Sequence, residues 1–154
     1  MMPTAMKRTI FHIVVALAAA AVATGALAHG TPEGMLRIKQ YMQTGVPAPY
    51  GELKNPLQAS AATIARGRAL YDEHCARCHG AKGLGDGPDL KELKLPPADL
   101  VHMLDMLPMN DDFFLWAVSE GGVPFGSQMP AFKDVLDRDD IWRVIAFMRA
   151  GFPR

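Results

Sequence analysis

The chain contains two cysteines, and they stand close together, with a histidine directly after the second. Cys75, Cys78 and His79 form the pattern Cys-x-x-Cys-His. At the end of a helix, this spacing lets two thiols add to the two vinyl groups of one haem while the adjacent imidazole binds the iron. A zinc ribbon would need a second cysteine pair, and a thioredoxin-like redox pair would need a βαβ setting. The motif therefore predicts one covalently attached haem.

The N-terminus predicts a signal peptide over residues 1–28. Two basic residues precede an apolar, alanine-rich run that ends in an Ala-x-Ala cleavage motif at residues 26–28. A run of this length is also close to what spans a membrane, so anchoring through residues 10–28 is the alternative, although small residues give it a modest insertion free energy. We expect cleavage after Ala28 and a periplasmic protein, which agrees with haem attachment outside the cytoplasm.

The remaining residues are enough for one compact domain. The sequence has 16 Lys plus Arg against 16 Asp plus Glu, so it lacks the basic surface of a protein that binds nucleic acid. Residues 29–60 are rich in proline and glycine, which predicts an irregular extension with one short helix ending near Gly45. Residues 61–154 predict the folded domain.

The folded domain shows helical periodicity and no strand pattern. A helix is expected from Ala61 to about His74, with Ser60 as its cap, followed by a glycine-rich loop over residues 80–97. Three more helices are expected over residues 98–107, 111–120 and 138–150, the last two capped by Asn110 and Asp137. A second loop, residues 123–132, contains Met129-Pro130. The pattern indicates an all-α fold.

The sequence resembles the class I cytochromes c, especially the bacterial branch that includes the cytochrome domains of cbb3-type oxidases. The resemblance covers residues 61–152 and consists of four matches in the same order: residues 65–71, residues 78–88 with their glycines and Pro88, residues 129–132, and the final helix around Trp142 and Phe147. It implies a cytochrome c fold, a single domain of about four to five helices around one covalent haem. It also implies an electron carrier rather than an enzyme.

The resemblance further implies roles for individual residues. Met129 would bind the iron on the face opposite His79, since a soft thioether stabilises ferrous iron. The Pro88 carbonyl would accept a hydrogen bond from the ring nitrogen of His79 that does not bind iron. Trp116 would lie along the haem and offer its indole N–H to a propionate, or would simply pack in the core. Gly67 would let the first helix of the domain cross the last one closely.

A row of soft ligands follows the glycine-rich loop, at His102, Met103, Met106 and Met109. Thioethers bind Cu(I), which leaves a copper site open. The same spacing predicts an amphipathic helix whose flexible methionines pad the haem, and we favour that interpretation.

Such carriers dock with redox partner proteins through small, transient interfaces, under about 1,200 Å² in total. Two alternatives remain open. The chain could relay electrons as a held subunit of a dehydrogenase or terminal oxidase at the membrane. It could also be a haem-based enzyme or sensor, which would need an open iron site.

Overall fold

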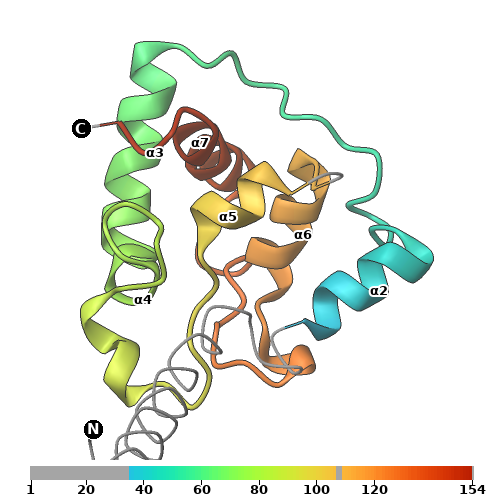
Figure 1. Ribbon diagram of the computed structural model, residues 1–154. Coiled ribbons are helices and arrows are strands. Elements are labelled where there is room, and N and C mark those ends of the chain that lie inside the picture. The colour runs from blue at the N-terminus through green and yellow to red at the C-terminus, as the bar shows by residue number, and fades with distance from the viewer. Residues whose placement is uncertain (1–34, 107–108, 154) are drawn as a thin grey trace, which may run out of the picture. The chain divides into compact units, whose positions relative to one another are not determined.

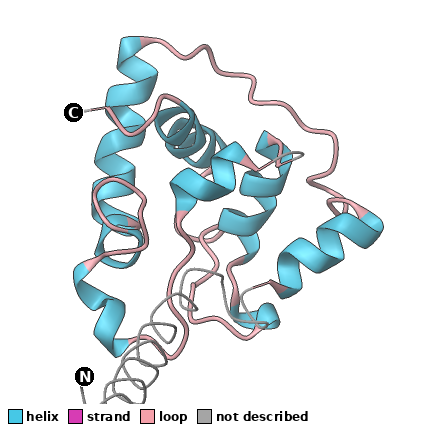
Figure 2. Ribbon diagram, in the orientation of Figure 1, coloured by secondary structure: helices cyan, strands magenta, loops and turns pink. Residues whose placement is uncertain are grey.

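The computed structural model describes residues 35–106 and 109–153. They form six α-helices, α2 (Leu36–Thr44), α3 (Ala61–His74), α4 (Ala76–His79), α5 (Leu100–Asp105), α6 (Asp111–Glu120) and α7 (Arg138–Arg149), and two 3₁₀ helices, η1 (Pro88–Glu92) and η2 (Val123–Phe125) (Figure 1). No strand occurs within these residues (Figure 2). The predicted all-α class is therefore confirmed. The predicted signal peptide lies outside the described residues.

Side-chain caps set the starts of three helices. Ser60, Asp99 and Asp137 each accept a hydrogen bond from the backbone N–H three residues ahead, at 3.1, 2.9 and 2.7 Å. Asn110 occupies the predicted N-cap position of α6, but its side chain makes no capping hydrogen bond. The start of α6 instead has two acidic residues in its first turn, which suit the positive end of the helix dipole.

Helices α3 and α7 form the main helix pair, and Gly67 lies where they cross. A Cβ atom at Gly67 would lie 2.0 Å from the Arg143 carbonyl oxygen and 3.1 Å from Phe147 Cβ. The backbones can approach this closely only without a side chain at residue 67. The predicted close crossing is confirmed.

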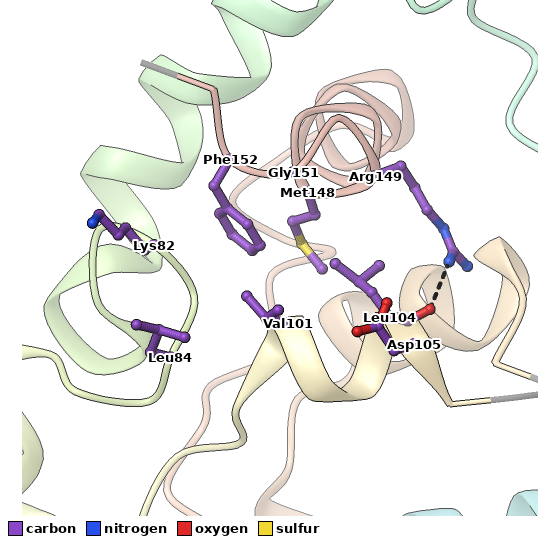
Figure 3. A pocket seen from close by; sticks show the side chains of 9 residues that line it. All are labelled: Lys82, Leu84, Val101, Leu104, Asp105, Met148, Arg149, Gly151 and Phe152. Carbon is purple, nitrogen blue, oxygen red and sulfur yellow. Dashed lines mark hydrogen bonds between the residues drawn. The ribbon is translucent and has the colours of Figure 1, made fainter.

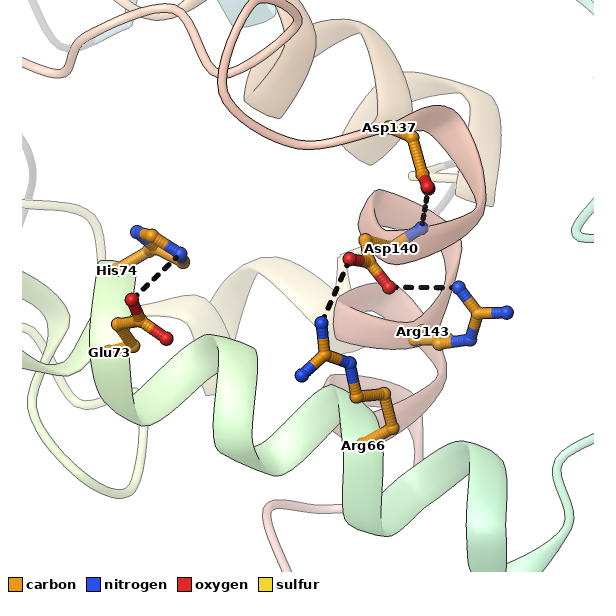
Figure 4. A network of polar contacts seen from close by, with 6 residues as sticks. All are labelled: Arg66, Glu73, His74, Asp137, Asp140 and Arg143. Carbon is orange, nitrogen blue, oxygen red and sulfur yellow. Dashed lines mark hydrogen bonds and ion pairs between the residues drawn. The ribbon is translucent and has the colours of Figure 1, made fainter.

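Charged side chains border the same crossing (Figure 4). Asp140 on α7 accepts a bond from Arg66 on α3 at 3.1 Å and one from Arg143 at 2.8 Å. Farther along α3, His74 lies 3.7 Å from Glu73 in an ion pair that exists only when the histidine is protonated. Exposed pairs of this kind contribute little to stability, so burial and close packing hold the crossing.

The core lies between α3, α6 and α7. Its largest fully buried side chains include Tyr71, Leu115, Ile141, Ile145 and Phe147. Tyr71 also donates a hydrogen bond of 2.8 Å to the Gly80 carbonyl, directly after the Cys-x-x-Cys-His motif. The core therefore fixes the end of the motif as well as the helices. Within the described residues, no helix has the length and apolar character needed to cross a membrane.

The extension before α3 folds back onto α6 and α7. Its predicted short helix is confirmed as α2, which ends at Thr44 with Gly45 as its C-cap. Three hydrogen bonds hold the residues that follow: Tyr50 hydroxyl to Glu120, Glu52 N–H to Asp112 (2.9 Å) and the Asn55 amide to the Trp142 carbonyl (2.9 Å).

Candidate functional site

Residues 75–79, here called the thiol segment, continue directly from α3 into α4. The Cys75 N–H bonds to the Tyr71 carbonyl at 2.8 Å, and the N–H groups of Cys78 and His79 bond to the Cys75 carbonyl at 3.1 and 2.9 Å. One helical turn thus separates the two cysteines, and residues three apart lie on the same side of a helix. The local backbone places the two thiols for attachment to a single group.

Both thiols are free and half-buried. Burial, and secondarily the neighbouring Cys78, raises the pKa of Cys75 to about 12. Burial is also the main cause that raises the pKa of Cys78. A redox-active cysteine pair works through a thiol of lowered pKa. The structure therefore argues against the thioredoxin-like alternative.

The His79 ring is held by one hydrogen bond. Its Nδ1 lies 3.0 Å from the Ala98 carbonyl oxygen. Because a carbonyl can only accept, Nδ1 carries the proton and Nε2 keeps a lone pair for a metal. Burial lowers the pKa of His79 and the bond to Ala98 opposes this shift, so burial favours the neutral ring that iron ligation requires.

The partner of His79 is therefore Ala98, and the predicted partner Pro88 was wrong. The reason lies in the glycine-rich loop. A Cβ atom on Gly85 would lie 2.8 Å from the Pro97 carbonyl, and Leu100 N–H bonds to the Gly83 carbonyl at 2.6 Å. The chain before α5 thus runs against these glycines and presents the Ala98 carbonyl to the ring, whereas Pro88 begins η1.

Residues 121–132, here called the methionine loop, carry Met129. Gly122 N–H donates to the Met129 carbonyl at 2.8 Å. Gly121 has φ of 65°, and a Cβ atom there would lie 2.5 Å from Ala131 N and from the Pro130 carbonyl carbon. Only glycine fits this turn without strain. The turn packs the start of the loop against Met129-Pro130.

The structure brings the predicted residues to one apolar core from different elements. Cys75, at the junction of α3 and α4, and Met129, between α6 and α7, are both partly buried against the same hydrophobic cluster. Trp116 is 4% exposed and packs edge-to-face on Phe113 and Phe125, with ring centroids 6.1 and 5.7 Å apart. Its core-packing role is thus visible. Iron ligation by Met129 and propionate binding by Trp116 remain predictions.

Arg37 on α2 is a residue that the sequence analysis missed. It is 8% exposed, its guanidinium carbon lies 4.3 Å from the ring centroids of Trp116 and Phe125, and Nη2 donates to the Gly121 carbonyl. Burial lowers its pKa to about 10, against an opposing effect of Glu120. Because arginine side chains are usually exposed, the composition of the sequence did not predict that Arg37 is buried. One usable signal was its i,i+4 spacing to Tyr41 on an inward face.

The row of soft ligands does not share one surface. Met103 and Met106 are half-buried against the core, Met109 is 4% exposed and His102 is exposed on α5. This distribution favours the interpretation that the methionines pad the haem, and it argues against a shared copper site.

A cavity of about 480 Å³ lies between α5, α7 and the glycine-rich loop (Figure 3). Leu84, Val101 and Leu104 approach it from one side and Met148 and Phe152 from another. Arg149 at its rim bonds to the Leu104 carbonyl at 3.4 Å. Neither the thiol segment nor Met129 lines it, so it is separate from the predicted ligands.

The donor set fits a covalently attached haem. Two unpaired thiols lie one turn apart, and the imidazole beside them has its Nδ1 committed and its Nε2 open. A thioether on a separate loop packs against the same apolar core. This combination of two soft sulfur nucleophiles, one oriented imidazole and one thioether matches what a c-type haem requires.

Comparisons with known proteins agree with this assignment. The family model described as cytochrome c oxidase, cbb3-type, subunit III matches residues 62–148. Cytochrome c550 of Pseudomonas aeruginosa is 26% identical over 155 residues, which cover 94% of this chain and 95% of that protein. A chain from the reducing HAO-like protein complex of Kuenenia stuttgartiensis has a TM-score of 0.53 and 24% identity, covering 72% of this chain and 53% of that one. The last likeness shows the fold alone.

Proposed function

The chain belongs to the cytochrome c family of cbb3-type oxidase subunit III, and from this premise we propose that it is an exported mono-haem carrier of single electrons. Membership of this family implies electron transfer. The observation that carries the proposal is the arrangement of two free thiols beside a histidine whose Nδ1 is bound by Ala98. That arrangement provides attachment and ligation at one place.

Four side chains would hold the haem. The thiols of Cys75 and Cys78 would each add across one haem vinyl group and hold the haem as thioethers, an addition that needs no oxidant. His79 Nε2 and the Met129 sulfur would both bind its iron. When bound, the haem iron supplies the one-electron change between its ferric and ferrous states.

The remaining residues tune and protect this site. The Ala98 carbonyl orients the His79 ring and strengthens it as a donor. Tyr71 holds Gly80 in place at the end of the thiol segment. The apolar cluster behind Cys75 and Met129 excludes water, and a thioether ligand in such surroundings favours the reduced state.

We place this carrier in the periplasm after removal of residues 1–28, where it would meet redox partner proteins through transient contacts. A held relay subunit in a membrane respiratory complex is the related alternative. Co-purification of the native protein with membranes after a high-salt wash would favour the relay. Recovery in the periplasmic fraction would favour the diffusing carrier.

Mass analysis of the exported chain tests the proposal directly. Full-length protein is produced in a bacterium that matures c-type cytochromes, and the expected mass is that of residues 29–154 plus one haem. The matched control carries Cys75→Ala with Cys78→Ala and must give a chain without haem. A wild-type chain of bare polypeptide mass would overturn the proposal.

The visible spectrum of the oxidised protein tests whether a methionine binds the iron. Ferric haem bound by methionine shows a weak long-wavelength charge-transfer band, which five-coordinate haem lacks. Its presence would support the carrier. Its absence in wild-type protein would favour an enzyme or sensor with an open iron site.

A further inference from the structure

Arg37 is a buried cation with an unsatisfied donor. Its Nη1 atom is buried and has no hydrogen-bond partner among residues 35–106 and 109–153. Buried polar groups are nearly always paired, and an unpaired buried charge is strongly unfavourable. This donor therefore points to an acceptor that the described polypeptide does not supply.

The contacts that Arg37 does make are incomplete for a guanidinium. Nη2 donates to the Gly121 carbonyl, and the rings of Trp116 and Phe125 lie at 4.3 Å from the guanidinium carbon. The aromatic faces attract the positive charge. They accept none of the in-plane N–H bonds of the guanidinium fork, which has five donors. One edge of the fork is thus left for an oxygen acceptor.

The acidic side chains of α6 near this position are already engaged. Glu120 attracts Arg37 electrostatically, but its carboxylate accepts one bond from the Tyr50 hydroxyl at 2.5 Å and two from Lys133 Nζ at 2.9 and 3.1 Å. Asp112 accepts bonds from the N–H groups of Glu52 and Phe113 at 2.9 and 2.8 Å. Neither carboxylate is hydrogen-bonded to Arg37.

We propose that Arg37 binds a propionate carboxylate of the haem, so that the extension preceding the family domain completes the cofactor site. This inference rests on the proposed function. The group that the thiol segment is built to attach carries two carboxylates, and a guanidinium fork is the best-matched partner for a carboxylate in low-dielectric surroundings. Arg37 precedes the family match, which begins at residue 62, and reaches the start of the methionine loop through Gly121.

The proposal predicts a specific electrostatic effect. A propionate paired with Arg37 stays ionised in both oxidation states, so the reduction potential is nearly independent of pH. Without Arg37, the uncompensated carboxylate stabilises ferric iron and takes up a proton more readily on reduction. The potential then falls at high pH and recovers as the pH is lowered.

The test uses the haem-loaded full chain with Arg37→Met, which keeps side-chain length and removes the charge. Potentials are measured by spectroelectrochemistry from pH 5 to pH 8, with the long-wavelength band as a check that methionine ligation persists. At pH 8 we expect the equilibrium constant for reduction to fall up to tenfold, which equals about 59 mV for one electron, and to recover toward pH 5. Lys39→Met, on the exposed side of the same helix, must leave the potential unchanged.

Two further variants keep the test decisive. If the Arg37→Met chain does not load haem, Arg37→Gln takes its place, because it retains a donor for the Gly121 carbonyl. The same fall in potential at pH 8 is expected from it. Adding Glu120→Gln to Arg37→Met must leave the pH dependence in place, because loss of that dependence would identify Glu120 as the titrating group and overturn the proposal. A flat, unshifted potential in the Arg37 variants would also overturn it and assign Nη1 to water or a solution anion. Absence of haem from the wild type, seen by mass, would instead refute the proposed function.

Discussion

The thiol segment and the methionine loop hold the two predicted iron ligands in different ways. In the thiol segment, the backbone N–H groups of Cys75, Cys78 and His79 donate to carbonyls three or four residues earlier. In the methionine loop, Gly121 is bound by Arg37, which lies 84 residues away in the sequence. The backbone that carries His79 is thus set by a helical turn, although the His79 ring is held by the more distant Ala98 carbonyl. The backbone of the methionine loop is held by a tertiary contact.

This difference has a consequence for how the two sides respond to change. The thiol segment would be fixed by covalent bonds once haem is attached. The methionine loop depends on non-covalent contacts with α2 and on tight turns at glycine. Local opening begins where such contacts are fewest, so we expect the methionine side to give way before the thiol side.

The largest expected effect comes from Met129→Ala. Loss of the thioether removes the ligand that favours ferrous iron, so the reduction potential should fall by well over the roughly 59 mV that marks a tenfold change for one electron. The covalent haem should stay in place, since the thiol segment is untouched. Spectroelectrochemistry measures the first outcome and mass analysis the second.

Met42→Ala is the matched control for this change. Met42 lies on α2 with 64% of its surface exposed, so its loss should leave the potential unaltered. An unchanged potential in Met129→Ala would mean that another residue binds the iron. The methionine loop would then not carry an iron ligand, and the comparison with the thiol segment would fail.

A second change, Gly121→Ala, isolates the tight turn of the methionine loop. The positive φ costs about 1 kcal/mol for alanine, and the clash with the backbone at residues 130–131 adds about 1–3 kcal/mol. We therefore expect a loss of about 2–4 kcal/mol in the free energy of unfolding, together with a weakened long-wavelength band. Guanidinium unfolding and the oxidised spectrum measure these effects.

Gly45→Ala separates the two causes. Gly45 has φ of 75°, close to that of Gly121, but a Cβ atom there meets nothing within 4 Å. This variant should lose only the conformational share of about 1 kcal/mol and keep the band. Equal losses in both glycine variants would show that the packing of the methionine loop contributes nothing.

The local side of this contrast is also the side that could be predicted from the sequence. The helix of residues 61–74, its Ser60 cap and the close crossing at Gly67 all depend on short-range pattern or on one small residue, and the structure has them as expected. The placement of the two cysteines one turn apart at the end of that helix follows from the same local spacing.

The long-range side could not be predicted in the same way. Ala98 binds His79 because the chain before α5 packs on the glycine-rich loop, a contact between segments that no local pattern encodes. Arg37 is buried because aromatic faces on α6 and η2 receive it. A charged residue in a polar-looking extension carries no local sign of such a position.

The smallest expected effect concerns Glu120, which links the extension to the end of α6 beside the methionine loop. Hydrogen bonds from Tyr50 and Lys133 lower the pKa of Glu120 from its ordinary value of 4.5. Because the folded-state pKa lies below the unfolded one, the stabilisation is fully present above pH 4.5 and is lost as the pH falls through the folded-state value.

Glu120→Gln should therefore reduce the free energy of unfolding by up to about 1 kcal/mol at pH 7. This difference from wild type in the free energy of unfolding should disappear in acid. Urea unfolding at pH 7 and at a pH below the folded-state pKa of Glu120 measures it. Tyr50→Phe, which keeps the Lys133 pair, should show a smaller gap with the same direction of pH dependence. A gap that persists unchanged in acid would mean that the carboxylate's charge does not anchor the extension, and that shape alone fastens it beside the methionine loop.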